Sequence, residues 1–230
     1  KLKEKKDIIN FGENISDIIL FDKNKIIVSY KEERIKLFLL ERNTFRKETT
    51  FTPVEIQNLR EIKNIDKVSC MKELINGTLL LGTTNGNIMN LEINETKKKN
   101  KSEFSVKLLN QIKLDNKINE LIEINCNNFI ANDNNKYNTI INNFQIKKEL
   151  NKGRISKTKN KLIILDSDYV LFYDIKNNFE EIGKLELNII NQTIINDNYM
   201  VAEDSDKYKI HLLNIEEIKK IIEKDYDPHE

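Results

Sequence analysis

Short apolar runs separated by turn-forming residues make up most of the chain, and this repetition limits the folds open to it. The clearest unit spans Leu74 to Ile93 and contains two pairs, Asn76-Gly77 and Asn85-Gly86, each flanked by apolar residues. Asn and Gly tolerate positive φ, so both pairs predict tight turns between antiparallel strands. The unit is therefore interpreted as three strands joined by two hairpin turns.

Four further units follow the same plan, with turns that lack the Asn-Gly pair. They lie at residues 15–40, 118–144, 154–175 and 189–213, and a fourth strand follows most units, at 44–51, 104–114, 147–150 and 179–187. The runs are rich in Ile and Val and are interrupted by Asn and Asp, which favours strands over helices. Two exceptions are a short helical turn within 53–63 and a terminal helix with Ile215, Ile218, Ile221 and Ile222 on one face.

Equivalent positions of the units recur at intervals that scatter about the ~40–45 residues of one four-stranded propeller blade. The sequence therefore predicts an all-β protein, a β-propeller of four-stranded antiparallel blades with about five blades in this chain. We expect an N-terminal extension at 1–14, the blades at 15–214 and a helical or extended tail at 215–230. A sandwich or an irregular all-β domain is the alternative, because short alternating strands occur in several architectures.

Two short motifs resemble parts of a WD40 repeat. Thr84-Asn85-Gly86-Asn87-Ile88 resembles the turn between the second and third strands of a WD40 blade, and Phe172-Tyr173-Asp174-Ile175 resembles its closing Trp-Asp step. No blade carries Gly-His or Trp-Asp, so the resemblance is one of pattern. It implies a ring of seven blades, of which five would be present here. The rest would have been removed from a longer protein, as the first residue Lys1 also indicates, or another chain would complete the ring.

Composition indicates an intracellular protein. The 38 basic and 37 acidic residues give a net charge of +1, and neither sign is concentrated in one half, so neither a nucleic-acid surface nor a membrane surface is indicated. Two cysteines, Cys70 and Cys126, are too few for a disulfide framework. The chain has no signal peptide pattern and no apolar run of membrane-spanning length. We expect a cytoplasmic or nuclear protein, and its use of Asn, Lys and Ile is typical of an AT-rich eukaryotic genome.

Motifs for chemistry are missing from the sequence. His211 and His229 belong to no cluster with metal-ligand spacing, and the two cysteines lie far apart, so no metal site is predicted. The sequence contains neither a phosphate-binding glycine loop nor a Gly-x-Ser-x-Gly elbow. The basic run 97–101 between two strands has no aromatic neighbours and is interpreted as a solvated loop. We expect no catalytic residue and no cofactor.

Turns between second and third strands should lie together at one end of a propeller. These are the segments 31–34, 84–87, 132–136, 166–168 and 204–206. Such loops are held by rigid blades and commonly bind partners. The candidate partner-binding residues at this end are Asp166, Asp168, Glu203, Asp204, Asp206, Lys31 and Arg34. The acidic residues predict a patch that attracts a basic peptide, although Asp also simply forms turns.

The predicted function is a non-catalytic protein–protein interaction scaffold, a subunit of a larger assembly. The first alternative is an enzyme or small-ligand binder built on a propeller, which would gather polar residues at the central channel. The second is an architectural role, in which the chain braces a ring formed with a neighbouring chain, because exposed edge strands promote association.

Overall fold

The structure is a computed structural model that describes residues 14–31, 35–43, 48–63, 65, 67–98, 101–125, 127–133, 137–166, 169–186, 189–196, 198–204 and 210–215. The chain forms two compact units, unit 1 (Lys1–Leu150) and unit 2 (Asn151–Glu230). The regular structure of the described residues consists of strands, with one short 3₁₀ helix and a single helical residue, Ile215. None of their helices is long and apolar enough to cross a membrane.

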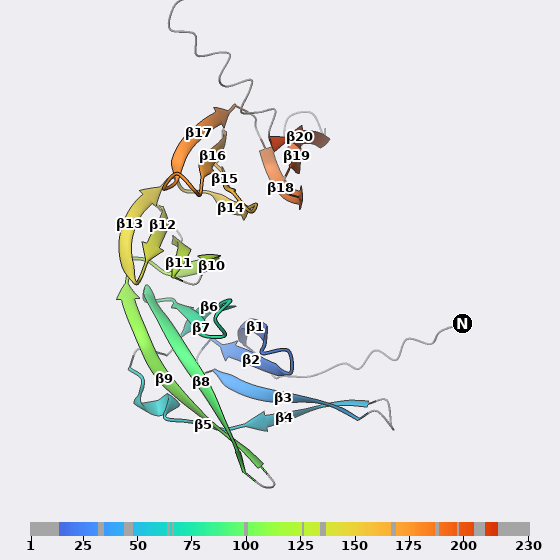
Figure 1. The fold of residues 1–230 in the computed structure, drawn as a ribbon, viewed down its shortest axis with the longest axis vertical. Coiled ribbons are helices and arrows are strands. Elements are labelled where there is room, and N and C mark those ends of the chain that lie inside the picture. The colour runs from blue at the N-terminus through green and yellow to red at the C-terminus, as the bar shows by residue number, and fades with distance from the viewer. Residues whose placement is uncertain are drawn as a thin grey trace, which may run out of the picture. The chain divides into compact units, whose positions relative to one another are not determined.

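Unit 1 contains three sheets, which we call blades 1, 2 and 3 (Figure 1). Blade 1 has the order β1 (Ile15–Phe21), β2 (Lys25–Tyr30), β3 (Lys36–Asn43), β4 (Glu48–Val54). Blade 2 has the order β5-β9-β8-β7-β6, from β5 (Ile56–Gln57), β6 (Val68–Glu73), β7 (Leu79–Thr83), β8 (Asn87–Lys98) and β9 (Lys101–Lys113). Blade 3 has the order β10 (Ile118–Asn125), β11 (Asn128–Asp133), β12 (Asn138–Asn142), β13 (Gln145–Leu150).

Unit 2 contains two sheets, blades 4 and 5. Blade 4 has the order β14 (Arg154–Lys157), β15 (Lys161–Leu165), β16 (Val170–Asp174), β17 (Glu180–Leu185). Blade 5 has the order β18 (Ile189–Asn196), β19 (Tyr199–Asp204), β20 (Ile210–Asn214). Every pairing in both units is antiparallel except the short parallel contact of β5 with β9.

The prediction of an all-β protein with four-stranded antiparallel sheets is confirmed, but one boundary was wrong. The unit that begins at Leu74 in the sequence has its first strand earlier, at β6, and Leu74 itself lies in the turn before β7. Of the two turn pairs, only Gly77 and Gly86 have positive φ, whereas Asn76 and Asn85 do not. The helical turn expected within 53–63 is the 3₁₀ helix η1 (Leu59–Glu61). The extension 1–13 and the tail 216–230 lie outside the described residues.

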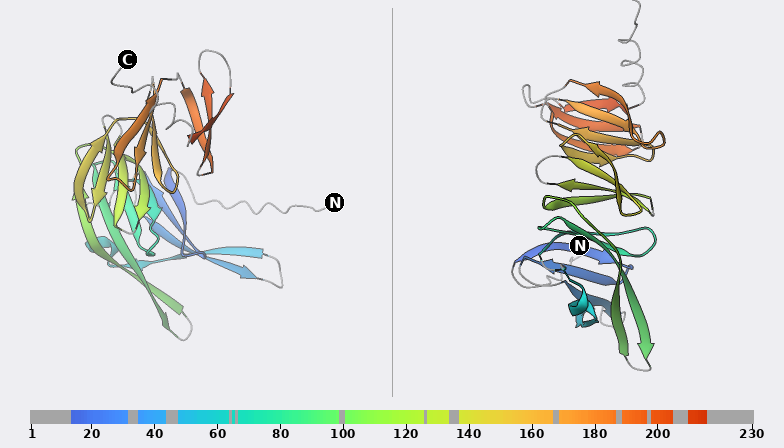
Figure 2. Two further views of the ribbon diagram at one scale, coloured as in Figure 1. Left: turned by 45° about the horizontal axis from the view of Figure 1, so that its top comes forward. Right: turned by 90° about the vertical axis from the view of Figure 1, so that its left-hand side faces the viewer.

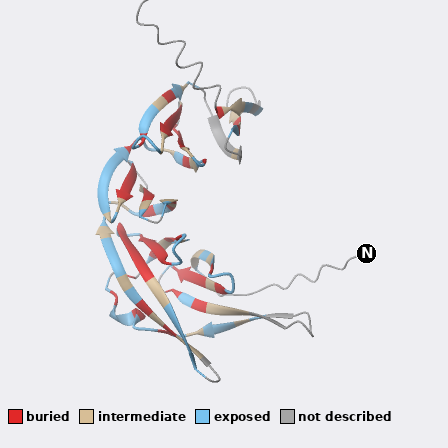
Figure 3. Ribbon diagram, viewed as in Figure 1, coloured by how far each residue is buried: buried red, intermediate tan, exposed pale blue. Residues whose placement is uncertain are grey.

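The middle strands form the core because they are covered on both faces. In β7, Leu79 and Leu81 pack with residues of blade 1, whereas Leu80, on the opposite face, packs with residues of blade 3. All five residues of β7 are buried, in contrast to β13, whose first five residues are exposed (Figure 3). Figure 2 shows the three sheets of unit 1 stacked face to face, with β6 in contact with both β1 and β10.

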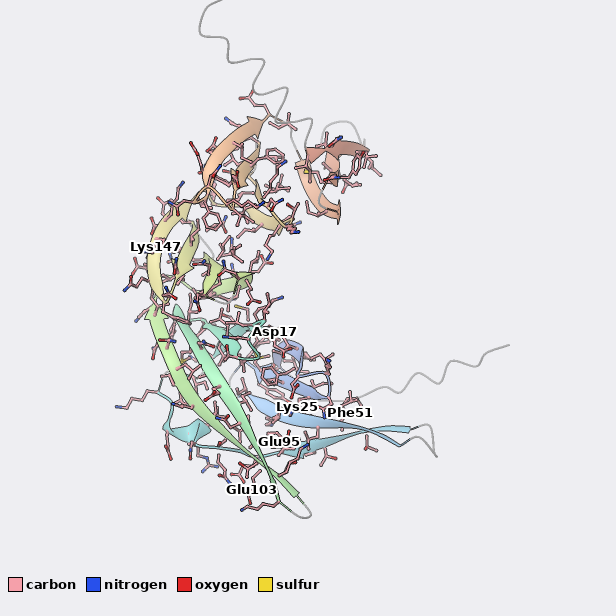
Figure 4. The ribbon with its side chains drawn as sticks, in the orientation of Figure 1. Asp17, Lys25, Phe51, Glu95, Glu103 and Lys147 are labelled. Atoms are coloured by element: carbon pink, nitrogen blue, oxygen red, sulfur yellow. The ribbon has the colours of Figure 1, made fainter. Side chains whose placement is uncertain are left out.

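The hairpin of β8 and β9 is longer than the other hairpins, and its tip extends past β4 and β5 (Figure 1). Lys25 of β2, only 4% exposed, connects it to blade 1. The Lys25 ammonium lies 3.3 Å from Glu95 Oε2, bonds to Asp22 and sits 5.9 Å from the centre of the Phe104 ring (Figure 4). Lys97, Lys98 and Lys101 belong to the strands rather than to a loop.

A β-bulge recurs at the start of the first strand in four of the five blades. In each case one residue has no partner on the second strand, and these residues are Ser16, Ser69, Asn119 and Ile190. A bulge increases local twist. The bulge therefore adds the same extra twist at the beginning of each of these strands.

Candidate functional site

Hydrogen bonds between blades fix the direction of the first strands in unit 1. Met71 N donates to Asp17 Oδ2 at 2.6 Å, and Ser69 Oγ donates to Ile118 O. At the other end, Ile75 N donates to Glu123 Oε1 at 2.9 Å. Residues near the start of one first strand thus bond to residues near the start of the next, and residues near the ends also bond to each other. Therefore β1, β6 and β10 run in the same direction. The connections between second and third strands of the three blades therefore lie at one end, which we call the rim of unit 1.

The linker between blades 2 and 3 crosses this rim. Leu114 N donates to Gly86 O at 2.9 Å, in the turn between β7 and β8. Gly86 has a φ of 81°, and a Cβ on it would lie 2.2 Å from Leu114 O. Only glycine allows the linker to pass this close. The contact holds the linker residues Asp115 and Asn116 in place beside blade 3.

A cleft of about 360 Å³ lies between this linker and blade 3, and we call it the rim cleft. Its lining combines charged, polar and apolar side chains, and consists of Lys113, Leu114, Asp115, Asn116, Asp133, Tyr137, Thr139, Ile146 and Glu149. Asp133 is the centre of its hydrogen bonding: Oδ2 accepts from Asn116 Nδ2 at 3.0 Å and Oδ1 from Tyr137 N at 3.1 Å. These bonds fix the linker against the end of β11 and join Asp133 to Tyr137, which precedes β12.

The rim cleft offers negative charge next to exposed apolar surface. Three carboxylates, Asp115, Asp133 and Glu149, face a single lysine, Lys113, in its lining. Tyr137 is 44% exposed and Ile146 is 50% exposed. Exposed carboxylates attract a basic group over several ångströms, while aromatic and aliphatic side chains supply contact area. The cleft therefore presents negative charge and apolar contact area on one surface.

The candidate partner-binding residues predicted from the sequence lie in different environments in the structure and do not form one described surface. Asp166 is 8% exposed, and its backbone N donates to Tyr169 O at 3.0 Å, which closes the turn from β15 to β16. Glu203 is half-buried, and Asp204 ends β19. Lys31 is exposed on the rim of unit 1. Arg34, Asp168 and Asp206 lie outside the described residues, so the acidic patch of unit 2 stays a prediction.

The closing aromatic-Asp step of blade 4 has a structural role. Tyr173 is buried in β16, and its hydroxyl donates to Asn151 Oδ1 at 3.3 Å. Asp174 accepts hydrogen bonds from Lys176 N at 2.8 Å and Asn177 Nδ2 at 3.0 Å, in the turn that follows. The motif therefore ends the third strand and shapes the turn to the fourth.

Side chains for metal binding are not brought together in the part of the chain that the structure describes. It contains no cluster of three or more His, Cys, Asp or Glu that could hold a metal ion. Cys70 is buried, and desolvation raises the pKa of its thiol to about 12. The thiolate is the nucleophilic form of cysteine, so Cys70 is inert at neutral pH.

The fold is that of a WD40-type β-propeller repeat protein. Among solved structures the chain is similar to the WD40 beta propeller domain of Doa1, with a TM-score of 0.52 and 10% sequence identity. The match covers 88% of this chain and 66% of that domain, and at this identity it shows the fold alone. No family model and no curated protein matches the sequence.

The rim cleft was missed by the sequence analysis, although part of it was in view. Asp133 belongs to a predicted rim loop, but Asp115 and Asn116 lie in a linker between two blades, where the sequence analysis predicted no binding residue. A signal was present in Leu114-Asp115-Asn116, an apolar residue followed by two polar residues between a fourth strand and the next first strand. In a propeller this linker lies at the same end as the turns between second and third strands.

Proposed function

We propose that the protein is a non-catalytic interaction scaffold in the cytoplasm or nucleus, a subunit of a larger assembly, and that the rim cleft binds a basic segment of a partner protein. The observation that carries this proposal is the combination of Asp115, Asp133 and Glu149 with exposed Tyr137 and Ile146 around one cleft. WD40-type propellers are typically non-enzymatic and generally bind proteins, which supports this assignment.

The rigidity of the cleft supports the proposal. The linker is held by the bond from Leu114 to Gly86 and by the bond from Asn116 to Asp133, and the wall behind it is the buried core of blades 2 and 3. These bonds hold the linker side of the cleft in one position, so a partner that binds there has little of the linker to order.

Affinity purification of the full chain tests the proposal, with the wild type and the double variant Asp115→Lys/Glu149→Lys. Proteins recovered with the wild type should be lost from the variant and should dissociate as salt is raised. The matched control is Glu180→Lys/Glu181→Lys, an equal change of charge on exposed residues of blade 4. Recovery of the same proteins with both double variants would exclude the rim cleft as the binding site.

A further inference from the structure

The outer edge of β9 is only partly covered by another strand. Within the described residues, β9 pairs with β8 on one side and with the two-residue strand β5 on the other (Figure 1). β5 reaches only Phe104 and Ser105, whereas β9 continues to Lys113. Backbone N–H and C=O groups on such an uncovered edge can pair with a further strand.

The register of the β8–β9 hairpin determines which backbone groups point outward. Two residues separate Lys98 from Lys101, so this closing pair exchanges both of its hydrogen bonds. Hydrogen-bonded and non-hydrogen-bonded pairs alternate along an antiparallel ladder, which makes Leu91 and Leu108 a non-hydrogen-bonded pair. The N–H and C=O of Leu108 therefore point away from β8, and no strand of the described residues lies on that side.

The same alternation agrees with the position of β5. Glu95 and Phe104 also form a non-hydrogen-bonded pair, so the backbone groups of Phe104 point outward, and Phe104 is one of the two residues with which β5 pairs. Beyond Leu108 the ladder is interrupted, because Leu109 is an extra residue between the pairs of Leu108 and Asn110. The uncovered edge next to β5 is therefore short and suits a short segment.

A groove of about 750 Å³ lies between this edge and the segment 58–63, and we call it the β9 groove. The segment leaves β9 at Asn58, whose φ of 63° is left-handed and ends β5. Leu59 and Ile62 of the segment are buried in the core of blades 1 and 2, so this wall of the groove is anchored. A single extended chain can pair with β9 here, whereas the edge of a folded sheet would meet the wall.

The side chains along the groove alternate in character. Val106 and Leu108 pack against the core that contains Ile62. Lys107 lies between them, on the opposite face of the strand, and is exposed. The charged residues of the lining are Lys107, Lys63 and Glu61, all of them exposed, so the groove has a net positive charge. Such a lining favours a segment that carries negative charge over one that carries positive charge.

We propose that the β9 groove binds an extended segment of a partner polypeptide, in which apolar and acidic residues alternate, as an additional strand antiparallel to β9. The partner residue opposite Leu108 exchanges two backbone hydrogen bonds with it and places an apolar side chain on the face of Ile62. The next partner residue places a carboxylate on the face of Lys107. In this mode of recognition main-chain hydrogen bonds supply affinity and alternate side chains supply specificity.

The proposal does not depend on the rim cleft, because the two sites share no residue and attract opposite charges. It is tested by NMR titration of the full chain with the peptide Ac-Thr-Val-Glu-Val-Thr-NHMe. We expect saturable shifts of the backbone amides of Leu108 and Ile62. The peptide with Lys in place of Glu should bind about tenfold more weakly at low salt. An absence of shifts with the Glu peptide would overturn the proposal and leave the rim cleft untouched.

Two methylated forms of the peptide test strand pairing directly. In an antiparallel strand the two valine N–H groups face β9, and the N–H groups of Glu and of the last Thr face solvent. N-methylation of both valines should abolish the shifts, whereas N-methylation of Glu and the last Thr should leave the affinity within about twofold. The two forms have the same composition. Equal binding of both would show that side chains alone hold the peptide, which would overturn the proposal.

Protein variants provide an independent test. Leu108→Pro removes an N–H that points away from β8, so the β8–β9 ladder keeps its hydrogen bonds while peptide binding is lost. Leu108→Ala is the matched control, because it also removes the leucine side chain but retains the N–H and should still bind. Lys107→Glu should reverse the preference between the Glu and Lys peptides. Equal affinities of Leu108→Pro and Leu108→Ala would contradict pairing at this edge.

Discussion

The rim cleft and a second cavity of about 250 Å³ lie at the two ends of the same junction between blades 2 and 3, but they differ in chemistry. We call the second cavity the asparagine pocket, because its lining includes Asn76, Asn90, Asn110, Asn127 and Asn143. The rim cleft is open, has three carboxylates and exposes Tyr137 and Ile146. The asparagine pocket is lined without charge and has a buried carbonyl at Asn90. Exposed charge attracts a partner from a distance, whereas a buried polar group without a hydrogen-bond donor lowers stability.

The difference follows from how each end is built. At the rim, the linker crosses from one blade to the next and brings acidic residues near a loop of blade 3. At the other end, hairpin turns from both blades meet, and their asparagines favour turn conformations. One packed junction thus supports two cavities of different chemistry, and changes at the junction should affect both, while changes at either end should affect only one.

The largest effect is expected from Gly82→Val, which alters the junction itself. A Cβ at Gly82 would lie 2.7 Å from both Cys70 Sγ and Ile118 Cγ2. Overpacking there should lower the free energy of unfolding by about 3 kcal/mol, measured by urea denaturation, and weaken binding at the rim cleft. Gly77→Ala is the control: its Cβ meets no atom within 4 Å, so only its positive φ should cost about 1 kcal/mol. Equal losses for the two variants would contradict the packing argument.

Cys70 makes the junction sensitive to alkaline pH. Burial raises the pKa of its thiol from 9.0 to about 12, so the folded state keeps a proton that the unfolded state loses. The contribution of Cys70 is fully present below pH 9 and should fall by about 1.4 kcal/mol for each pH unit between pH 9 and 12. Urea denaturation at several pH values should show a shallower decline for Cys70→Ala. Parallel declines would mean that the thiol titrates normally.

Asn90→Leu should stabilise the protein. The substitution replaces a buried carbonyl without a donor by an apolar group of similar shape, which should raise the free energy of unfolding by about 1–2 kcal/mol. The rim cleft should be unaffected, because it shares no residue with the pocket. Thermal and urea denaturation measure the effect, with Asn94→Ser as the control. A destabilised Asn90→Leu protein would show that the carboxamide is satisfied within the fold.

The charge reversal Asp115→Lys/Glu149→Lys at the rim should have the smallest effect on stability. Both residues are exposed, so the free energy of unfolding should change by less than about 0.5 kcal/mol each. Association with a basic lysine-rich peptide, measured by surface plasmon resonance at low salt, should slow by about tenfold. The difference from wild type should diminish as salt is raised. If the association rate falls by an amount that does not depend on salt, contacts other than charge pairs govern binding.

The sequence predicted most strands because the middle strand of each blade is apolar on both faces. Leu79, Leu80 and Leu81 form such a run, and so do Leu162, Ile163 and Ile164. The first strand of blade 2 was misplaced because the bulge at Ser69 interrupts the alternation of buried and exposed residues. The length of the β8–β9 hairpin was missed because its far half is polar and is stabilised by tertiary contacts such as Lys25 with Glu95.

The two sites were beyond the reach of local patterns. Asp115 and Asp133 come together because two loops meet after the blade has folded, and the pocket around Asn90 joins residues from five separate segments. In a chain so rich in asparagine, no single asparagine is distinctive in the sequence. What distinguishes Asn90 is burial without a hydrogen-bond donor, which only the packed structure reveals.

The bulge at the start of β1, β6, β10 and β18 has a practical consequence for aligning this chain with distant relatives. The extra residues Ser16, Ser69, Asn119 and Ile190 share no common chemistry, yet they occupy the same place in their blades. A backbone irregularity of this kind persists while side chains diverge. Superposing blades on the bulge therefore provides a common origin for numbering residues between repeats, where comparison of amino-acid identities does not.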